Sequence, residues 1–460
     1  LESTIGFADF PELQAQEPLR IQLTKAGHLV VFASPGYGKS TFLQTVVMDL
    51  ARTHTPEQMH VYLLDFGTNG LLPLKDLPHV ADTFLVDDQE KISKLLRRLT
   101  DEIKARKKKL SEYGVANIEM YTKASGESVP HQVIVIDNYD SVREADYVEE
   151  FEALMTQIAR EGGSIGLHLV ISAGRQNALR MPLLSNIKTQ IALYLIDQAE
   201  MRAIVGRTEV EPEEIPGRGI MKLEQPTIFQ TALPVEGEDT LAVIENIQKE
   251  AKLMQHRWDG DVPRPIPMVP ETLHFHEFKQ WPSTTSVYEN EAITLGVDVD
   301  DVMPVPLHLE KISPFIITGD DYTKTIDSLE IVIDSLIDLG SDVIVIDNDQ
   351  YTFSDYQNKN CAYGEGNEFF MRIFEQLKEW FSKRREAVGE LRKQNAPRED
   401  IQALYREMNR VTIVMTDYAI IRNKLDPSIE EQLITLLEQS KEYQIHFIIG
   451  GSLSLLEGYD

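Results

Sequence analysis

The sequence predicts an α/β protein built from two diverged copies of one module, each a mostly parallel sheet flanked by helices. The first observation is that short apolar runs rich in Val and Ile alternate with helical stretches, which is typical of buried parallel strands joined by crossover helices. The second is that these segments occur twice in the same order. The third is their spacing, with 26 residues from Lys39 to Asp65 and 23 from Lys324 to Asp347.

Each copy begins with the same series of segments. A short strand with Gly, a Pro-led strand and a buried strand lead to a turn, and a Lys-Ser or Lys-Thr pair then opens a helix. These series span Ile5–Leu43 and Leu295–Ile326. The later strands correspond in three pairs, which are His60–Phe66 with Asp342–Asn348, Gln132–Asp140 with Val411–Ala419, and Gly166–Arg175 with Gln444–Leu453. Four matched segments in one order indicate an internal repeat.

The two copies are separated by a segment of different composition. Residues Glu236–Trp258 fit one amphipathic helix, and Asp259–Leu273 contains four prolines, which is typical of an extended connector. We therefore expect a first domain at 1–233, a helical and Pro-rich linker at 234–290 and a second domain at 291–460.

A long helix is predicted over Asp88–Tyr113. Its apolar stripe consists of Ile92, Leu95, Leu96, Leu99, Ile103 and Leu110. The helix ends in the basic run Lys104–Leu110. Two interpretations of this run are a binding site for an anionic partner and a solvated helix face, and the second is favoured.

The composition limits the classes of function. The 460 residues include 74 acidic and 45 basic ones, a formal net charge of -29, which argues against a protein that binds nucleic acid through phosphate neutralisation. The single Cys361 excludes an internal disulfide framework. No apolar run approaches the roughly 18 residues of a membrane span. The chain begins at Leu1, and we expect it to be part of a longer protein.

The first copy contains a phosphate-binding loop, ASPGYGKST, at Ala33–Thr41. It matches G-x-x-x-x-G-K-[ST] except that Ala33 replaces the first Gly, and it lies between a strand and an apolar helix, as the motif requires. Backbone N–H groups of the turn would face the phosphates, Lys39 would neutralise the β- and γ-phosphates, and the Ser40 hydroxyl would reach Mg²⁺. The candidate nucleotide-binding residues are Pro35, Gly36, Tyr37, Gly38, Lys39, Ser40 and Thr41.

Asp137, at the end of the strand QVIVID, is the candidate second ligand of Mg²⁺, with a water molecule between the carboxylate and the ion. Hydrolysis usually also needs a carboxylate that orients the attacking water. Asn138 occupies the position that follows Asp137, and an amide cannot accept a proton. Asp65 and Asp140 are possible substitutes, with a strand-end cap as the alternative for Asp65. The sequence thus supports ATP binding with Mg²⁺ more strongly than rapid hydrolysis.

Arg175 ends the predicted strand GLHLVISAGR, at the edge where ligands of open α/β sheets bind. It is a candidate catalytic residue, either as a phosphate sensor or as an arginine finger for a neighbour, and a structural salt bridge is the alternative. Ser172 is a candidate polar sensor. His168 and His446 occupy matched strand positions and are expected to be packed core residues.

The second copy keeps the order of segments but loses key residues. Its weak nucleotide-binding candidates are Gly319, Asp320, Asp321, Tyr322, Thr323, Lys324 and Thr325. Two carboxylates lie where phosphates would approach, which opposes a triphosphate electrostatically. Thr323 replaces the Gly before the Lys, and Thr416 stands where the first copy has Asp137.

The motif order ASPGYGKST, LLDFGTNG, QVIVIDNYD and IGLHLVISAGRQNAL resembles the FtsK/SpoIIIE class of RecA-like P-loop ATPases. The connector PRPIPMVPETL and the degenerate second copy resemble, more narrowly, the last two ATPase domains of the EssC/EccC group of type VII secretion ATPases. The resemblance implies two tandem RecA-like domains, the second degenerate. It carries the roles of Lys39, Ser40 and Asp137 over by motif position, but not the catalytic Glu of the family.

The resemblance also implies partners and a location. Members of this group are membrane-anchored, with their ATPase domains on the cytoplasmic side. The resemblance implies that they oligomerise with other ATPase domains, as hexamers in the full assembly. They engage small secreted helical proteins of the WXG type. The competing functions are a double-stranded DNA translocase and a nucleotide-regulated scaffold that does not hydrolyse ATP. Residues 291–460 carry 32 acidic and 16 basic residues, so no basic footprint for DNA is present there.

Overall fold

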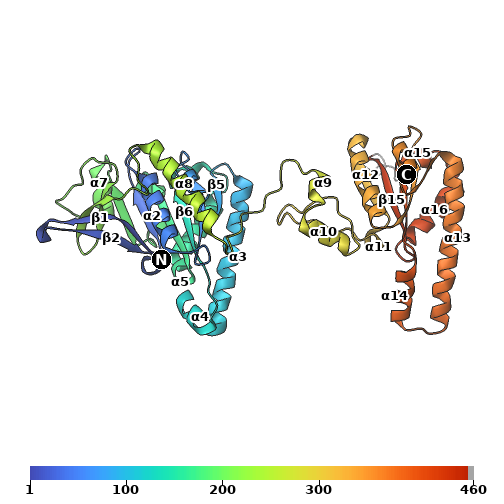
Figure 1. Cartoon of the computed structure of the whole chain (residues 1–460), viewed down its shortest axis with the longest axis horizontal. Helices are drawn as coiled ribbons and strands as arrows, with labels where there is room; N and C mark the ends of the chain where they lie inside the picture. Colours follow the sequence, from blue (N-terminus) through green and yellow to red (C-terminus); the bar gives the residue numbers. More distant parts are fainter. Residues whose placement is uncertain (454–460) are drawn as a thin grey trace. The chain divides into compact units, whose positions relative to one another are not determined.

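The computed structural model describes residues 1–453 and divides the chain into two compact units, Leu1–Ile266 and Pro267–Asp460. Figure 1 shows both units and labels part of their helices and strands. The division falls inside the segment 234–290 that the sequence predicts as a linker.

The first unit is built on one ten-stranded sheet with the order β2-β1-β10-β9-β8-β3-β7-β6-β4-β5. The strands from β8 to β5 are parallel, and the others are antiparallel. The strand bounds are β1 (Glu2–Phe10), β2 (Ala15–Gln22), β3 (Leu29–Phe32), β4 (Met59–Asp65), β5 (Val80–Leu85), β6 (His131–Asp137), β7 (Leu167–Ala173), β8 (Thr189–Leu193), β9 (Arg218–Lys222) and β10 (Pro226–Thr231).

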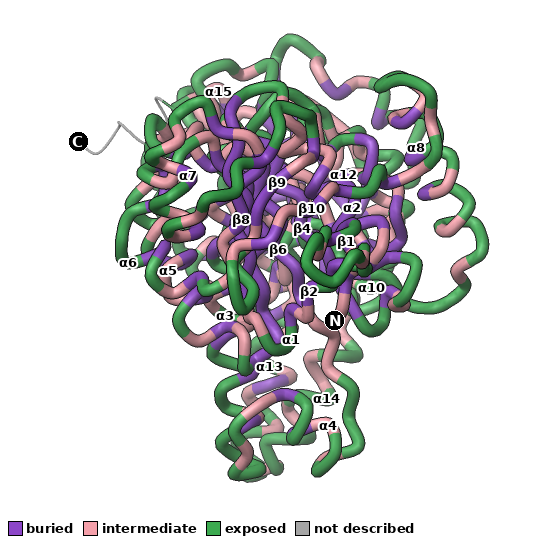
Figure 2. Tube along the Cα trace, turned by 90° about the vertical axis from the view of Figure 1, so that its left-hand side faces the viewer, coloured by how far each residue is buried: buried purple, intermediate pink, exposed green. Residues whose placement is uncertain are grey.

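Helices cover both faces of this sheet. The α-helices are α1 (Leu23–Ala26), α2 (Lys39–Thr53), α3 (Gln89–Tyr113), α4 (Ile118–Ser125), α5 (Val148–Ile165), α6 (Met181–Leu184), α7 (Gln198–Val205) and α8 (Thr240–Arg257). The helices α2 and α8 share one hydrophobic core with the sheet, whereas α5 packs on β7 and on α3. In Figure 2 the strands β4, β6 and β8 are buried along most of their length, as expected for strands between two helical layers.

The long helix predicted from the sequence is α3, and all six residues of its apolar stripe are buried. It ends where Gly114 adopts a left-handed conformation and donates its N–H to the carbonyls of Leu110 and Ser111, a common way to terminate a helix.

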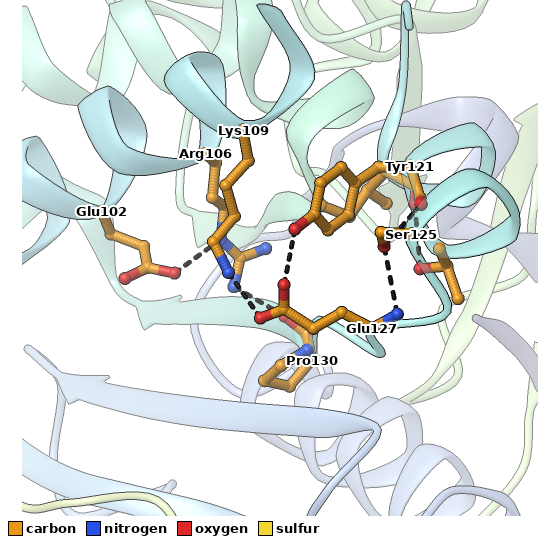
Figure 3. A network of polar contacts seen from close by, with 9 residues as sticks. Glu102, Arg106, Lys109, Tyr121, Ser125, Glu127 and Pro130 are labelled. Atoms are coloured by element: carbon orange, nitrogen blue, oxygen red, sulfur yellow. Dashed lines mark hydrogen bonds and ion pairs between the residues drawn. The ribbon is translucent and has the colours of Figure 1, made fainter. Parts of the chain in front are cut away.

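The basic run at the end of α3 is engaged in contacts within the unit (Figure 3). The Arg106 side chain is 2% exposed and donates hydrogen bonds to Glu102 at 2.6 Å and to the carbonyls of Ile165 at 2.8 Å and Pro130 at 2.7 Å. Arg106 therefore connects α3 to the end of α5 and to the residue that precedes β6, and it is a structural residue.

The lysines beside Arg106 also have acidic partners. Lys107 pairs with Glu161, Lys108 with Glu112 and Lys109 with Glu127. These pairs favour the solvated-face interpretation of the run over a binding site for an anion, because most of its positive charge is compensated locally.

The second unit has a five-stranded, fully parallel sheet with the order β11-β15-β14-β12-β13. Its strands are β11 (Phe315–Gly319), β12 (Asp342–Asp347), β13 (Ala362–Glu365), β14 (Val411–Met415) and β15 (Ile445–Ser452). Its helices are α9 (Phe275–Phe278), α10 (Pro282–Glu289), α11 (Leu309–Ile312), α12 (Tyr322–Asp338), α13 (Gly366–Lys393), α14 (Arg398–Glu407), α15 (Tyr418–Arg422) and α16 (Pro427–Glu438).

The sheet orders confirm the predicted repeat. The order β3-β7-β6-β4-β5 in the first unit corresponds strand by strand to β11-β15-β14-β12-β13 in the second. The expectation of two strands before β11 is wrong, because that region forms only isolated antiparallel bridges, Ile293 with Leu307 and Val297 with Pro304.

The segment predicted as a linker is partly docked on the first unit. Val243, Ile247 and Ala251 of α8 belong to the hydrophobic core of that unit. Beyond α8, Ile266 is buried and its N–H donates to Asp82 at 2.9 Å. The helix and the first part of the Pro-rich stretch are therefore integral to the first unit.

Within residues 1–453, no helix combines the length and the apolar character that crossing a membrane requires.

Three histidines cluster where β3, β6 and β7 begin: His28 and His168 are buried, and His131 is partly buried. His131 and His168 are hydrogen-bonded through their rings at 3.0 Å, His168 contacts the Gly27 carbonyl at 2.7 Å, and His28 accepts the N–H of Leu169. Burial lowers the pKa of His28 and of His131 to about 4 and the pKa of His168 to about 3. His168 and His446 are fully buried, as expected for core residues.

We predict that the first unit loses stability as the pH falls from about 6.5 towards 4. The unfolded chain binds protons at these histidines near their ordinary pKa, whereas the folded unit binds them only at lower pH, so each contributes on the order of 1–2 kcal/mol to the loss. Denaturant unfolding at several pH values measures this. In His168→Gln the free energy of unfolding should depend less on pH, whereas the exposed control His256→Gln should behave like the wild type. An unchanged pH dependence in His168→Gln would contradict the lowered pKa of His168.

Candidate nucleotide-binding site

The candidate site lies at the carboxyl edge of the parallel strands in the first unit. The strand β3 ends at Phe32, and α2 begins at Lys39, so six residues form the loop between them. All four side chains of the strand are buried, and Leu29 and Val31 share one hydrophobic core with the apolar face of α2. The loop is thereby held between two rigid elements, and its backbone N–H groups and the start of α2 form an anion-binding turn.

Two glycines give this loop its shape. Gly36 has a φ of 86° and Gly38 a φ of 101°, in the left-handed region that glycine adopts without a steric cost. The start of the loop is anchored to its neighbours in the sheet, because Ala33 N–H donates to the Ala173 carbonyl and Ser34 N–H to the Tyr194 carbonyl. The loop is therefore shaped before any ligand binds.

Lys39 folds back over the loop. Its Nζ donates a hydrogen bond to the Ala33 carbonyl at 2.9 Å. Burial lowers the pKa of Lys39, and the nearby carboxylates of Asp140 and Asp137 act in the opposite direction. The amine can exchange one carbonyl for phosphate oxygens, which are stronger partners because they are charged.

Ser40 and Asp137 form the centre of the site. The Ser40 hydroxyl donates to Asp137 Oδ2 at 2.7 Å, and the Ser172 hydroxyl donates to Asp137 Oδ1 at 2.6 Å. Asp137 is buried at the end of β6, and Ser172 lies on the adjacent β7. The residue predicted as a polar sensor thus holds the candidate metal ligand in place.

The donors at this point fit Mg²⁺, which prefers oxygen ligands and keeps several phosphate or water oxygens. Two glycines leave room around the pair. A Cβ on Gly70 would lie 2.6 Å from Ser40 Oγ and 2.8 Å from Asp137 Oδ2, and a Cβ on Gly67 would lie 3.3 Å from Asp137 Oδ2. No cluster of three or more His, Cys, Asp or Glu side chains suited to a metal occurs in residues 1–453, so a metal here would rely on the phosphates for most of its ligands.

The candidate catalytic residue Asn138 turns away from the loop. Its amide Nδ2 lies 2.8 Å from Ser141 Oγ and 3.4 Å from the Phe66 carbonyl, and its φ is 57°. The left-handed region favours Asn among the residues with a side chain. Asn138 therefore stabilises the turn that follows β6.

Asp65 and Asp140 have different surroundings. Asp65 Oδ2 accepts the N–H of Leu71 at 3.0 Å, as in the predicted strand-end cap, and burial raises the pKa of Asp65. Asp140 Oδ2 accepts the N–H of Gly174 at 2.8 Å, at the end of β7. Asp140 therefore lies at the strand next to β3, whereas Asp65 lies two strands farther away.

Arg175 is exposed at the edge of the site. Its side chain forms no ion pair with the residues that the structure describes, so the salt-bridge alternative has no support there. The guanidinium remains accessible to a ligand or to a partner.

On its other side the loop contacts the aromatic ring of Tyr194 and the segment Glu214–Gly217. The rings of Tyr37 and Tyr194 lie 4.6 Å apart. The Tyr37 hydroxyl donates to Glu214, and Gly217 N–H donates to the Tyr37 carbonyl at 3.0 Å. No sequence motif predicts that Tyr194 and the segment Glu214–Gly217 contact the loop, because only the fold brings them close to it.

The matching region of the second unit does not form such a loop. Only Asp320 and Asp321 separate β11 from α12. Asp321 caps the helix by accepting the N–H of Thr323 at 2.9 Å, so α12 begins at Tyr322 and Lys324 lies on the helix, exposed. This geometry argues against the weak nucleotide site proposed for Gly319–Thr325.

Tyr322 fills the corresponding space. Its hydroxyl donates to the Thr416 carbonyl at 2.8 Å and contacts Asn348 at 3.2 Å. Asp347 accepts hydrogen bonds from the Tyr363 hydroxyl at 2.6 Å and from the Phe353 N–H at 2.9 Å. The polar groups of this edge therefore satisfy one another within the unit.

We predict that Gly70→Ala weakens Mg²⁺-dependent nucleotide binding about tenfold or more, because the added methyl group must displace Ser40 or Asp137. Calorimetric titration of the variant with a nonhydrolysable ATP analogue and Mg²⁺ measures the effect. Gly389→Ala, where nothing lies within 4 Å of the new Cβ, is the matched control. Equal affinities for both variants would show that Gly70 does not border the site.

The FtsK/SpoIIIE family model matches residues 2–216. The type VII secretion system protein EssC of Staphylococcus aureus (strain MRSA252) is 40% identical over 310 residues, which cover 67% of this chain and 21% of that protein. The chain thus spans about a fifth of the length of this relative.

Two solved structures are similar over nearly the whole chain. EssC (ATPases 2 and 3) from Geobacillus thermodenitrificans has a TM-score of 0.82 at 28% identity, covering 99% of this chain and 85% of that one. EccC (ATPases 2 and 3) from Thermomonospora curvata, in complex with a signal sequence peptide, has a TM-score of 0.57 at 25% identity, covering 99% and 81%. The chain therefore belongs to the FtsK/SpoIIIE family, in the EssC/EccC group of type VII secretion ATPases.

Proposed function

We propose that this chain is the ATP-binding motor or regulatory part of a type VII secretion ATPase, with one nucleotide site, in the first unit. The observation that carries the proposal is the contrast between the two units. The first has a six-residue loop with Lys39 and the Ser40–Asp137 pair, and the second has a two-residue turn filled by Tyr322.

ATP with Mg²⁺ is the ligand that these groups fit. The loop N–H groups and the start of α2 would bind the phosphates, and Lys39 would compensate their charge. Ser40 and Asp137 would hold Mg²⁺, which screens the phosphate charge when bound. Ser172 keeps the Asp137 carboxylate directed at Ser40.

The second unit is proposed to engage the exported protein. A small pocket opens at the carboxyl edge of its sheet, with apolar walls from Ile346, Phe370, Ile420 and Ile421 and with Asp349 and Lys424 at its rim. Apolar walls with a few polar groups suit the side chains of an amphipathic helix. The EccC complex contains a signal sequence peptide, which supports binding of an exported protein, and we propose small helical WXG-type proteins as the substrates.

The charge distribution disfavours a double-stranded DNA translocase. The net charge is -29, and the lysines at the end of α3 are paired within the unit. We place the chain on the cytoplasmic side of the bacterial cell membrane, as part of a membrane-anchored protein that assembles with other ATPase domains, as a hexamer in the full assembly.

We predict that Lys39→Ala weakens ATP binding about a hundredfold, because it removes a charged donor from a partly buried phosphate site. Lys324→Ala, at the matched position of the second unit, is the control and should bind ATP like the wild type. Calorimetry with a nonhydrolysable analogue measures both. Loss of binding in Lys324→Ala with normal binding in Lys39→Ala would move the site to the second unit and refute the proposal.

We also predict that Ile420→Arg lowers the affinity for a WXG-type substrate at least about tenfold, since a charge would enter an apolar pocket. Binding of the labelled substrate by fluorescence anisotropy tests this, and ATP binding should stay unchanged. Ile434→Arg, at an exposed position on α16, is the control. Normal substrate binding by Ile420→Arg would exclude this pocket as the contact.

A further inference from the structure

The site described above lacks an obvious acceptor for the proton of an attacking water. Asn138 follows Asp137 directly, but an amide cannot take a proton, and its Nδ2 is directed at Ser141 and Phe66. Three carboxylates remain at this edge of the sheet, those of Asp65, Asp137 and Asp140. Their contacts distinguish between them.

Asp137 is the candidate ligand of Mg²⁺ and is therefore not available as the base. Both of its oxygens already accept hydrogen bonds, one from Ser40 and one from Ser172. A carboxylate that binds Mg²⁺ is a weak base, because the cation stabilises its charged form.

Asp65 lies beside Asp137, on the neighbouring strand β4, and is held by the turn after that strand. The sheet order places β4 three strands from β3, which corresponds to about 14 Å at the usual strand spacing. One of its oxygens accepts the Leu71 N–H, and the other has no hydrogen-bond partner among the residues that the structure describes. Its position suits the turn after β4.

Asp140 lies close to the phosphate loop, at the end of the strand next to β3. It belongs to the 3-10 helix η3 (Tyr139–Glu144), and its Oδ2 accepts the Gly174 N–H at 2.8 Å. Gly174 follows β7, the immediate neighbour of β3. Asp140 is also the carboxylate with the largest electrostatic effect on Lys39, ahead of Asp137.

The turn after β6 explains how Asp140 reaches this place. The left-handed backbone at Asn138 reverses the chain after Asp137, and the hydrogen bond from Asn138 to Ser141 closes the turn. Asp140 then stands at the end of β7, with Oδ2 fixed by Gly174 and with the side chain at the edge of an open pocket. Asn138 is thus a positioning residue for Asp140.

We propose that Asp140 is the catalytic carboxylate of ATP hydrolysis in this chain, a role that rests on the proposed ATP binding in the first unit. Asp140 accepts a hydrogen bond from a water molecule and directs the water oxygen at the γ-phosphorus. A bond forms between them while the bond to the β,γ-bridging oxygen breaks, and its electron pair stays on ADP. The water proton passes to Asp140 and then to solvent.

The test uses the whole chain with Mg²⁺ and γ-labelled ATP under single-turnover conditions, together with calorimetric binding of a nonhydrolysable analogue. Asp140→Asn keeps an oxygen that can accept the Gly174 N–H but cannot take a proton. We expect its ATP affinity to stay within about threefold of the wild type, and phosphate release to fall about 10²–10⁴-fold. Asp140→Glu should recover part of the rate.

Glu144→Gln is the matched control, because Glu144 is an exposed acid on the same 3-10 helix and borders the same pocket. It should hydrolyse ATP at the wild-type rate. Phosphate release by Asp140→Asn within threefold of the wild type would overturn the proposal, as would an equal loss of affinity and rate. If the wild-type chain binds ATP but releases no phosphate, the role of Asp140 alone is overturned. If the wild-type chain does not bind ATP, the proposed function is overturned as well.

Discussion

The hydrogen bond between Ser40 and Asp137 is the interaction on which the candidate site depends. It joins the first turn of α2 to the end of β6 at 2.7 Å, although 97 residues separate the two side chains in the sequence. The bond requires that α2 pack tightly on the sheet, that Ser172 hold the carboxylate from β7, and that Gly70 leave space beside the pair. The candidate site for phosphate and metal depends on these three conditions being met at one edge of the sheet.

The second unit has the same order of strands but, in the part that the structure describes, lacks a hydrogen bond that corresponds to the one between Ser40 and Asp137. The strand order is retained, because it follows from the burial of apolar strands between helices. The loop is not retained. Asp321 caps α12, which therefore starts two residues before Lys324, and the Tyr322 hydroxyl donates to the Thr416 carbonyl just after β14. Burial raises the pKa of Tyr322 to about 12, so the hydroxyl keeps its proton and remains a donor.

Much of this architecture could be predicted from the sequence, since it rests on periodicity and on one strongly constrained motif. The repeated strands, the α3 stripe and the loop with Lys39 are local patterns with a direct physical meaning. The early start of α12 also has a local signal, an Asp placed two residues before Thr323. The close approach of Gly70 to Ser40 and the burial of Arg106 have none, because they depend on which segments the fold brings together. For the same reason the sequence left Asp65 and Asp140 as equal alternatives, and only the sheet order and the Gly174 contact separate them.

The central claim is that the two units have divided their tasks, with one nucleotide site in the chain. The number of nucleotides bound per chain tests it most directly. Equilibrium dialysis of the wild-type chain against a labelled nonhydrolysable ATP analogue, at saturating Mg²⁺, should reach one nucleotide per chain. A plateau at two would show that the second unit also binds nucleotide and would contradict the account.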